Sequence, residues 1–288
     1  GPLVNSEFYP GWIVTWHQKG RVDPSVHDIM NGSMYMFELG ASFNYYMFFG
    51  GTNFAFWNGA ETTSAVRFVA YRSRLLKSGG NLTISVIKDH GYIFVGENYQ
   101  GMLVDSLHEY QKRWILINGQ SGDNLTIIVE NRGRQTFETV NDYKGILSNV
   151  TLDEAIIEDW IHYPLQLPLS LDIVNDEIGN IFARHKGTHR ETHGKPGVYI
   201  GRFSAKTQRD TFVDTTGWGK GQLFINGFNV GRYWPSVGPQ TTLYVPAPLI
   251  RRKNIVMMLE LIGPPKCSSW KCTLEFIDHP IFNFTSNN

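Results

Sequence analysis

The sequence has no surplus of charge and no long apolar run. Its 288 residues include 26 basic and 26 acidic side chains, so the formal net charge is zero. Such a chain has no general field that attracts nucleic acid or anionic lipid, and we expect no nucleic-acid partner. A membrane-spanning helix needs roughly 18 apolar residues, but the run Met34 to Gly51 is interrupted by Glu38, Gly40, Ser42 and Asn44. We therefore expect no membrane span.

Cysteine is scarce as well. Only Cys267 and Cys272 occur, with four residues between them. This spacing can close a small disulfide loop in an oxidising compartment, whereas a metal site would need more ligands than one pair supplies. Five Asn-x-Ser/Thr sequons, if glycosylated, point the same way: Asn31, Asn81, Asn124, Asn149 and Asn283. Together these features favour the secretory or lysosomal route.

The N-terminus lacks an initiator methionine and a charged segment followed by an apolar core. No signal peptide is visible, and we expect the chain to be a piece of a longer protein. The hydrophobic content of 42% is typical of a globular protein, and the length suffices for two domains.

Aromatic residues are concentrated at the start, where they occupy 14 of the first 60 positions. Glu7 stands between a short apolar run and the rings of Phe8, Tyr9 and Trp12. A carboxylate beside aromatic planes suits sugar chemistry, because the carboxylate can attack an anomeric carbon while rings cover the apolar face of a pyranose. Taken alone, however, a single carboxylate at a strand end is more often solvated and without chemistry.

Residues 1–60 have the pattern of a strand, a helix and a second strand. The expected strands are Gly1 to Ser6 and Ala41 to Phe49, and the expected helix is Val26 to Leu39, with Ile29, Met36 and Leu39 facing inward. This order is the unit of a parallel α/β sheet, and in barrels of that kind the chemistry lies at the C-terminal ends of the strands. We interpret most rings between Phe43 and Phe49 as the packing of a buried central strand.

From about Val66 the chain changes to short β-rich runs separated by Gly and Asn turns. This pattern predicts an antiparallel sandwich, with strands at Ile84–Val86, Tyr92–Val95, Trp114–Ile117 and Leu125–Val129. A short helix is expected over Leu152 to Trp160. An extended connector with Pro164 and Pro168 follows, and after it an exposed loop over Leu171 to Lys195.

Three histidines in that loop, His185, His189 and His193, recur at intervals of four. On a helix this spacing would place three imidazoles on one face as metal ligands. Because Gly187 interrupts the run and no apolar stripe supports a helix, we interpret the spacing as fortuitous and expect no metal.

A second sandwich is expected from about Val198. An Asn-Gly pair at Asn226 lies between two apolar runs and predicts a hairpin, and Tyr244–Val245 and Ile255–Leu261 supply further strands. The side chains of Arg232, Tyr233 and Trp234 suit either a sugar-binding ledge or a contact that fixes the hairpin against the neighbouring domain. We favour the contact.

Several motifs resemble the β-galactosidases of glycoside hydrolase family 35, particularly the animal lysosomal kind. They occur in family order over nearly the whole chain: Gly-Pro-Leu-Val-Asn-Ser-Glu-Phe-Tyr-Pro-Gly-Trp (1–12), Tyr-Met-Phe-Phe-Gly-Gly-Thr-Asn-Phe-Ala-Phe-Trp-Asn-Gly-Ala (46–60), Val-Glu-Asn-Arg-Gly-Arg (129–134) and Gly-Gln-Leu-Phe-Ile-Asn-Gly-Phe-Asn-Val-Gly-Arg-Tyr-Trp-Pro (221–235).

The resemblance implies a function and a set of site residues. Glu7 matches the nucleophile at the end of the seventh barrel strand, which forms a galactosyl-enzyme intermediate. Tyr9, Trp12 and Tyr46 match positions that line the galactose pocket. The implied reaction is retaining hydrolysis of terminal non-reducing β-D-galactose from glycans or glycolipids, without metal or organic cofactor. Lysosomal residence follows from the resemblance alone, and a homo-oligomer stays open.

The chain also departs from the family. Phe137 stands where the animal enzymes have Tyr, and Val14 and Thr15 replace the usual Asp-His. The family carries its general acid/base in an Asn-Glu motif on the fourth strand, and this sequence has no Asn-Glu pair. About six barrel strands and a block between Ala60 and Arg67 are missing, which we interpret as an incomplete gene prediction. We expect the chain to be inactive alone.

We therefore expect a partial (β/α)8 barrel remnant followed by two antiparallel, jelly-roll-like β-sandwiches. The predicted division is a barrel end at 1–62, an incomplete first sandwich at 63–165, a connector at 166–197 and a second sandwich at 198–288. The alternative to an enzyme fragment is a non-catalytic module whose sandwiches bind carbohydrate or protein.

Overall fold

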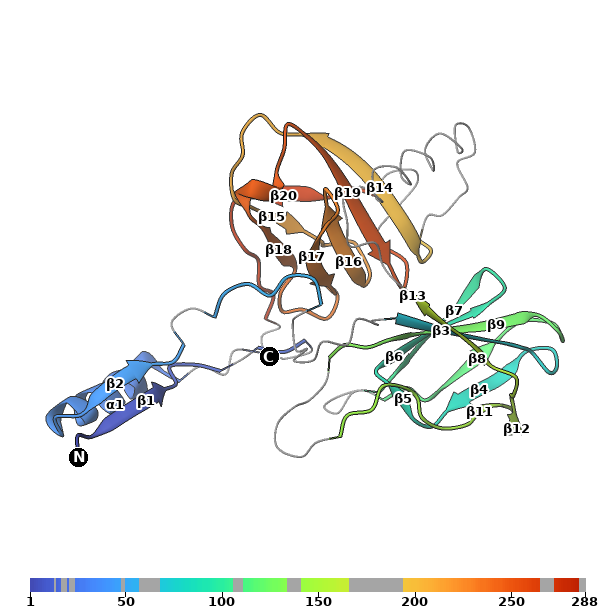
Figure 1. The fold of residues 1–288 in the computed structure, drawn as a ribbon, viewed down its shortest axis with the longest axis horizontal. Helices are drawn as coiled ribbons and strands as arrows, with labels where there is room; N and C mark the ends of the chain where they lie inside the picture. The colour runs from blue at the N-terminus through green and yellow to red at the C-terminus, as the bar shows by residue number, and fades with distance from the viewer. Residues whose placement is uncertain are drawn as a thin grey trace.

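The computed structural model describes residues 1–12, 14–16, 20, 24–47, 50–56, 68–105, 111–133, 141–165, 194–264 and 272–284. The described residues form a small N-terminal α/β unit and two groups of antiparallel sheets (Figure 1). Most of this structure is β-sheet, as expected.

The N-terminal unit is a strand, a helix and a strand. Strand β1 (Val4–Phe8) pairs in parallel with β2 (Ser42–Tyr45), and helix α1 (Val26–Glu38) connects them. The predicted strand-helix-strand order and the parallel pairing are confirmed. Figure 1 shows this unit projecting away from the two sandwiches.

Local sequence explains both ends of α1 and its contact with the sheet. The Ser25 hydroxyl accepts a hydrogen bond from the Asp28 backbone N–H and caps the N-terminus, and Gly40 follows the helix with φ of 67°. Gly32 faces the Phe8 ring, where an added Cβ would approach within 2.9 Å. The Ser33 and Tyr45 hydroxyls lie 2.7 Å apart. The helix packs on the sheet through these small contacts.

Two expectations about this unit are wrong. Leu39 is the C-terminal cap residue and is 50% exposed, so it does not face inward. The segment from Phe43 does not form a buried central strand: β2 ends at Tyr45, and Tyr45 is 40% exposed. Burial of a central strand requires neighbours on both sides, whereas β2 pairs only with β1 in the described part of the chain.

The first group of sheets forms a sandwich. One sheet has the order β13-β3-β9-β6-β7 and the facing sheet the order β12-β11-β4-β8, and β10 pairs with β5. Fifteen buried aliphatic side chains, among them Leu82, Ile93 and Ile127, form the core. The strands are β3 (Phe68–Arg74), β4 (Gly80–Ile84), β5 (Ile87–Lys88), β6 (His90–Val95), β7 (Asn98–Val104), β8 (Trp114–Ile117), β9 (Asn124–Glu130), β10 (Gly145–Ile146), β11 (Val150–Leu152), β12 (Ala155–Ile156) and β13 (Ile161–Leu165).

The short helix expected over Leu152 to Trp160 is wrong. Here β11 turns into β12 through Asp153 and Glu154, both with positive φ. The Asp153 carboxylate accepts from the Asn81 N–H and pairs with Lys77, which stabilises a turn in place of a helix. The expected extended connector begins as strand β13, which pairs with β3.

The second group of sheets is also an antiparallel sandwich, with the sheet orders β14-β19-β16-β17 and β18-β15-β20. The predicted turn at Asn226 and Gly227 joins β16 to β17, and both residues have positive φ. The elements are β14 (Gly197–Ser204), β15 (Thr211–Asp214), β16 (Gly221–Ile225), β17 (Phe228–Tyr233), β18 (Thr242–Val245), the 3-10 helix η1 (Ala247–Leu249), β19 (Lys253–Glu260) and β20 (Glu275–Ile277).

A third apolar cluster joins the parts of the molecule. Phe56, Phe68, Tyr92 and Leu261 are all buried in it, and they come from the N-terminal segment and from both sandwiches. The segment before β3 also lies on the second sandwich, since the Ala55 N–H donates to the Asn229 carbonyl. None of the helices among the described residues is long and apolar enough to cross a membrane.

Candidate functional site

Glu7 lies near the end of β1, where the sequence placed it. The carboxylate accepts a 2.5 Å hydrogen bond from the Tyr9 hydroxyl, and the Glu7 N–H donates to the Asn5 side-chain oxygen. The hydrogen bond to the carboxylate raises the pKa of Tyr9, so Tyr9 stays a donor at neutral pH. The carboxylate is thereby held in one orientation at the strand end.

The three aromatic residues of the predicted site gather beside Glu7. The Tyr9 and Trp12 ring centroids are 5.5 Å apart, and the Tyr9 and Tyr46 centroids are 5.7 Å apart with the rings perpendicular. The Tyr46 N–H donates to the Phe8 carbonyl, which attaches the start of the post-β2 segment to the end of β1. Residues far apart in the sequence therefore meet at the carboxyl ends of the two parallel strands.

This cluster forms an open surface. Trp12 is 67% exposed, Tyr9 42% and Tyr46 40%. A carboxylate with a bound tyrosine and flanking rings can contact a sugar ring, and these exposures leave the cluster accessible to solvent. No group of three or more His, Cys, Asp or Glu that could hold a metal ion exists among the described residues.

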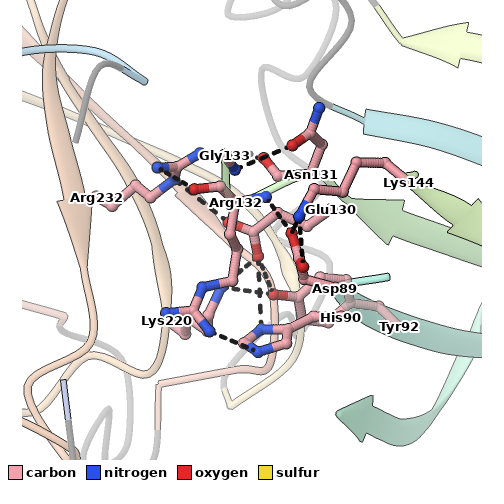
Figure 2. A network of polar contacts seen from close by, with 10 residues as sticks. All are labelled: Asp89, His90, Tyr92, Glu130, Asn131, Arg132, Gly133, Lys144, Lys220 and Arg232. Carbon is pink, nitrogen blue, oxygen red and sulfur yellow. Dashed lines mark hydrogen bonds and ion pairs between the residues drawn. The ribbon is translucent and has the colours of Figure 1, made fainter. Parts of the chain in front are cut away.

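A second polar site, hidden between the sandwiches, is centred on Glu130 of β9. Its Oε2 atom accepts a 2.6 Å hydrogen bond from the Tyr92 hydroxyl and pairs with Lys220 Nζ, which also lies 2.7 Å from the Tyr92 hydroxyl oxygen. Arg232 Nε lies 3.5 Å from Glu130 Oε1. We call Glu130, Tyr92, Lys220 and Arg232 the buried charge cluster (Figure 2).

The buried charge cluster connects the two sandwiches. Glu130 and Tyr92 belong to the first sandwich, whereas Lys220 and Arg232 belong to the second. Arg232 also donates through Nη2 to the Asn131 carbonyl. Lys220 and Glu130 are each only 1% exposed. Because substrate cannot reach such groups, we interpret the cluster as structural.

Opposite charges at short range set the ionisation of the cluster. Burial raises the pKa of the Glu130 carboxyl, but Lys220 and Arg232 outweigh it and hold the pKa well below its usual range. Burial lowers the pKa of Lys220 to about 8 against the opposing effect of Glu130. Both groups therefore carry charge at neutral pH.

A layer of rings and a guanidinium extends from the cluster to the N-terminal segment. Lys220 lies 5.2 Å from the Trp234 ring centroid, and Trp234 meets Trp16 edge to face at 5.6 Å. Arg132 lies over Trp16 at 5.2 Å. Trp16 follows Glu7 by nine residues, so the segment after Glu7 is attached to the junction of the sandwiches.

Sequence reasoning assigned part of this cluster and missed the rest. Arg232, Tyr233 and Trp234 are at most 5% exposed, so the sugar-binding ledge is wrong. The expected contact with the neighbouring sandwich is confirmed for Arg232, which meets Glu130 and Asn131, and for Trp234, which meets His90. Tyr233 instead bonds to Glu260 within its own sandwich. Glu130 stands inside a recognised motif, but no single-sequence signal connects it to Lys220, ninety residues away. A lysine between Trp218 and the apolar run Leu223–Ile225 was the one available hint.

The candidate glycosylation asparagines all lie on the surface. All five sequon asparagines are exposed: Asn31, Asn81, Asn124, Asn149 and Asn283. Cys272 is disulfide-bonded. Four expectations drawn from the sequence fall outside the described residues and stay predictions, and they concern Cys267, Phe137, the three spaced histidines His185, His189 and His193, and most of the loop 171–195.

Comparison with known proteins gives three family-model matches. The model described as "Glycosyl hydrolases family 35" matches residues 1–83, "Beta-galactosidase, first all-beta domain" matches residues 61–166, and "Beta-galactosidase, galactose-binding domain" matches residues 196–254. Among solved structures, a Pleurotus ostreatus lectin in its apo form is 11% identical over 70% of each chain with a TM-score of 0.22, too low to carry an argument.

Curated relatives cover the chain almost completely. The β-galactosidases of Felis catus, Bos taurus and Homo sapiens are each 30% identical, over 99%, 98% and 98% of this chain and 58%, 59% and 56% of their own length. The chain thus spans about three fifths of these relatives. The alignment with the cat enzyme runs over 404 residues, more than the 288 of this chain, so the relative has internal segments that this chain lacks. The chain is therefore similar to glycosyl hydrolases of family 35 at its start and to β-galactosidase domains over most of the rest.

Proposed function

We propose that the protein to which this chain belongs hydrolyses terminal β-D-galactosides with retention of configuration, and that Glu7 is the nucleophile. The observation that carries the proposal is the placement of the Glu7 carboxylate at the end of a parallel strand, bonded to Tyr9 and flanked by the rings of Trp12 and Tyr46. The family matches support the choice of galactoside.

The mechanism needs a second carboxyl group. In a retaining glycosidase Glu7 attacks the anomeric carbon and forms a glycosyl-enzyme intermediate. A partner carboxyl about 5–5.5 Å away protonates the leaving oxygen and then activates water. The Tyr9 hydroxyl orients Glu7, and the rings cover the apolar face of the sugar. The acid/base residue lies on strands that this chain lacks, so the chain alone is inactive.

The architecture that accompanies this function is also a proposal. Residues 1–62 form the last part of a barrel, 63–165 and 198–288 form the two sandwiches, and 166–197 connects them. The parallel β1–β2 pair supports the barrel, because a two-stranded parallel unit is unstable without further neighbours. The exposed sequons and the bonded Cys272 support residence in the lysosome or secretion.

The test is β-galactoside turnover by a longer protein that supplies the absent strands. Glu7→Gln should lower kcat by at least about 10³-fold, whereas Glu38→Gln, an exposed carboxylate at the end of α1, should leave it unchanged. A covalent galactosyl adduct on the peptide that contains Glu7 would identify the nucleophile directly. Full turnover by the Glu7→Gln protein contradicts the proposal.

The alternative of a non-catalytic sugar-binding module loses its expected residues. Arg232 and Trp234 were the proposed ledge, and both are 5% exposed. A sugar cannot stack on a buried ring, so a binding surface on the sandwiches has to lie elsewhere.

A further inference from the structure

The outer face of the second sandwich carries two adjoining hollows near the edge of the sheet. The first, of 570 Å³, is lined by Arg202, Arg251, Lys253 and five uncharged residues. The second, of 760 Å³, is lined by Lys206, Arg251, Arg252, Lys253 and four uncharged residues. Ser204, Arg251 and Lys253 line both hollows. We call this surface the cationic groove.

The register of the sheet explains why Arg202 and Lys253 face the same side. In the antiparallel pair of β14 and β19, Arg202 lies opposite Ile255 and Ser204 lies opposite Lys253. Side chains two residues apart point to the same face of a strand, so Arg202, Ser204, Lys253 and Ile255 share one face. The intervening Phe203 packs against Phe276 at 4.5 Å on the core side.

The backbone that presents Arg251 is held by a buried asparagine. Asn254, 2% exposed, accepts a 2.7 Å hydrogen bond from the Arg251 N–H and donates one of 2.6 Å to the Arg251 carbonyl. Asn226 donates to Asn254 Oδ1 and to the Leu249 carbonyl. The side-chain amides of Asn226 and Asn254 therefore hold the backbone in place. The side chains that can donate hydrogen bonds to a ligand in the groove are the cationic ones.

Charge balance is the unusual property of this groove. The whole chain is neutral, yet five cations and no carboxylate line the two hollows. Arg251, Arg252 and Lys253 form no ion pair within the described part of the chain. Asp210, the acidic residue nearest in sequence to Lys206, bonds to the Ala247 N–H and to the Tyr244 hydroxyl. The positive charge of Arg251, Arg252 and Lys253, which are all exposed, is therefore directed to solvent.

We propose that the cationic groove binds an acidic carbohydrate, a glycan that carries sulfate or carboxylate groups. Guanidinium and ammonium groups form charge-assisted hydrogen bonds with such anions, and several cations spaced along one groove suit a chain with repeated charges. The choice of a carbohydrate carrier rests on the proposed galactoside hydrolysis, since a substrate chain can extend from the catalytic unit to a secondary site.

The test measures by calorimetry the binding of the 288-residue chain to three polysaccharides of comparable length. A sulfated galactan probes sulfate, polygalacturonate probes carboxylate, and an unmodified galactan is the neutral comparison. We expect binding of at least one acidic polymer and not of the neutral one, with an affinity that falls as salt is raised. Equal binding of all three, or of none, overturns the proposal.

Variants locate the site. Arg251→Ala with Lys253→Ala should weaken binding about tenfold. Arg72→Ala with Arg113→Ala removes two exposed cations from the first sandwich and should leave the affinity within twofold. Equal loss in both double variants, or equal binding of duplex DNA, would indicate unspecific attraction and contradict a glycan site. The readout is binding, so an inactive chain still reports on the groove, and loss of hydrolysis leaves this result unaffected.

Discussion

The N-terminal unit and the sandwich junction use the same kinds of residue in opposite ways. At Glu7 a carboxylate and its rings are exposed, and Trp12 is 67% accessible. At Glu130 a carboxylate and its rings are buried, and Trp234 is 5% accessible. Glu7 pairs with no cation among the described residues and stays in water, whereas Glu130 is paired with two cations and can be enclosed. The charges of the second arrangement are balanced within this chain by Lys220 and Arg232.

The difference extends to apolar packing. Helix α1 exposes Val26, Met30, Met34 and Phe37 by half or more, whereas Ile127 and Leu223 of the sandwiches are fully buried. So many exposed apolar side chains on one helix are unusual in an independently folded soluble domain. The sandwiches should therefore form the stable part of the chain, and the N-terminal unit should contribute little to its free energy of unfolding.

The largest expected effect is loss of one partner in the buried charge cluster. Lys220→Met leaves Glu130 buried without its ammonium, and we expect the free energy of unfolding to fall by about 3–5 kcal/mol. The same substitution at exposed Lys253 should change it by less than about 0.5 kcal/mol. Urea denaturation measures both. Equal effects at the two lysines would show that the cluster does not join the sandwiches.

The next effect contrasts a buried apolar residue of the first sandwich with an exposed one of the N-terminal unit. Ile127→Ala, at a side chain with 0% exposure, should cost about 2–5 kcal/mol through lost burial and the cavity left behind. Met34→Ala, at 50% exposure on α1, should lower stability by less than about 1 kcal/mol. Thermal denaturation followed by circular dichroism compares the two variants. A larger loss at Met34 would mean that the N-terminal unit is already well packed.

A smaller effect is the pH dependence of the junction. The pKa of Glu130 is depressed in the folded state. The carboxylate therefore contributes fully to the free energy of unfolding above the usual pKa of a glutamate, and this contribution is lost as the pH falls through the folded pKa. The free energy of unfolding should therefore drop more steeply on acidification below about pH 4.5 in the natural protein than in the double variant Glu130→Gln, Lys220→Met. Parallel slopes for the two proteins would contradict charged burial of Glu130.

The smallest effect concerns the contact between the two regions. Trp16→Ala removes the ring that lies under Arg132 and beside Trp234. We expect global stability to change by about 1 kcal/mol or less, while amide exchange in residues 1–12 becomes faster. Hydrogen exchange resolved by peptide separates these outcomes. Unchanged exchange in that segment would mean that Trp16 does not attach it to the sandwiches.

The sequence predicted local features well. The β-rich run Leu125–Val129, the Asn-Gly pair before Phe228 and the strand-helix-strand order of the first 45 residues all correspond to observed elements. Each of these signals is contained within a few residues, since side-chain period and turn chemistry act locally.

What the sequence did not predict depends on distant partners. The turn at Asp153 is stabilised by Lys77 and by the Asn81 N–H, and these contacts override a helical propensity. The exposure of Tyr45 follows from missing neighbours of β2. The pairing of Glu130 with Lys220 joins two domains. No window of sequence contains both partners of such interactions.

The most direct test of this account is turnover of a fluorogenic β-galactoside by the purified 288-residue chain. The proposed retaining mechanism needs a second carboxyl beside Glu7, and the chain has no Asn-Glu pair of the kind that carries it in the family. We therefore predict no hydrolysis above background, with turnover restored when the proposed missing barrel strands are supplied and lost again in Glu7→Gln. Hydrolysis by the 288-residue chain alone, abolished by Glu7→Gln, would contradict the account.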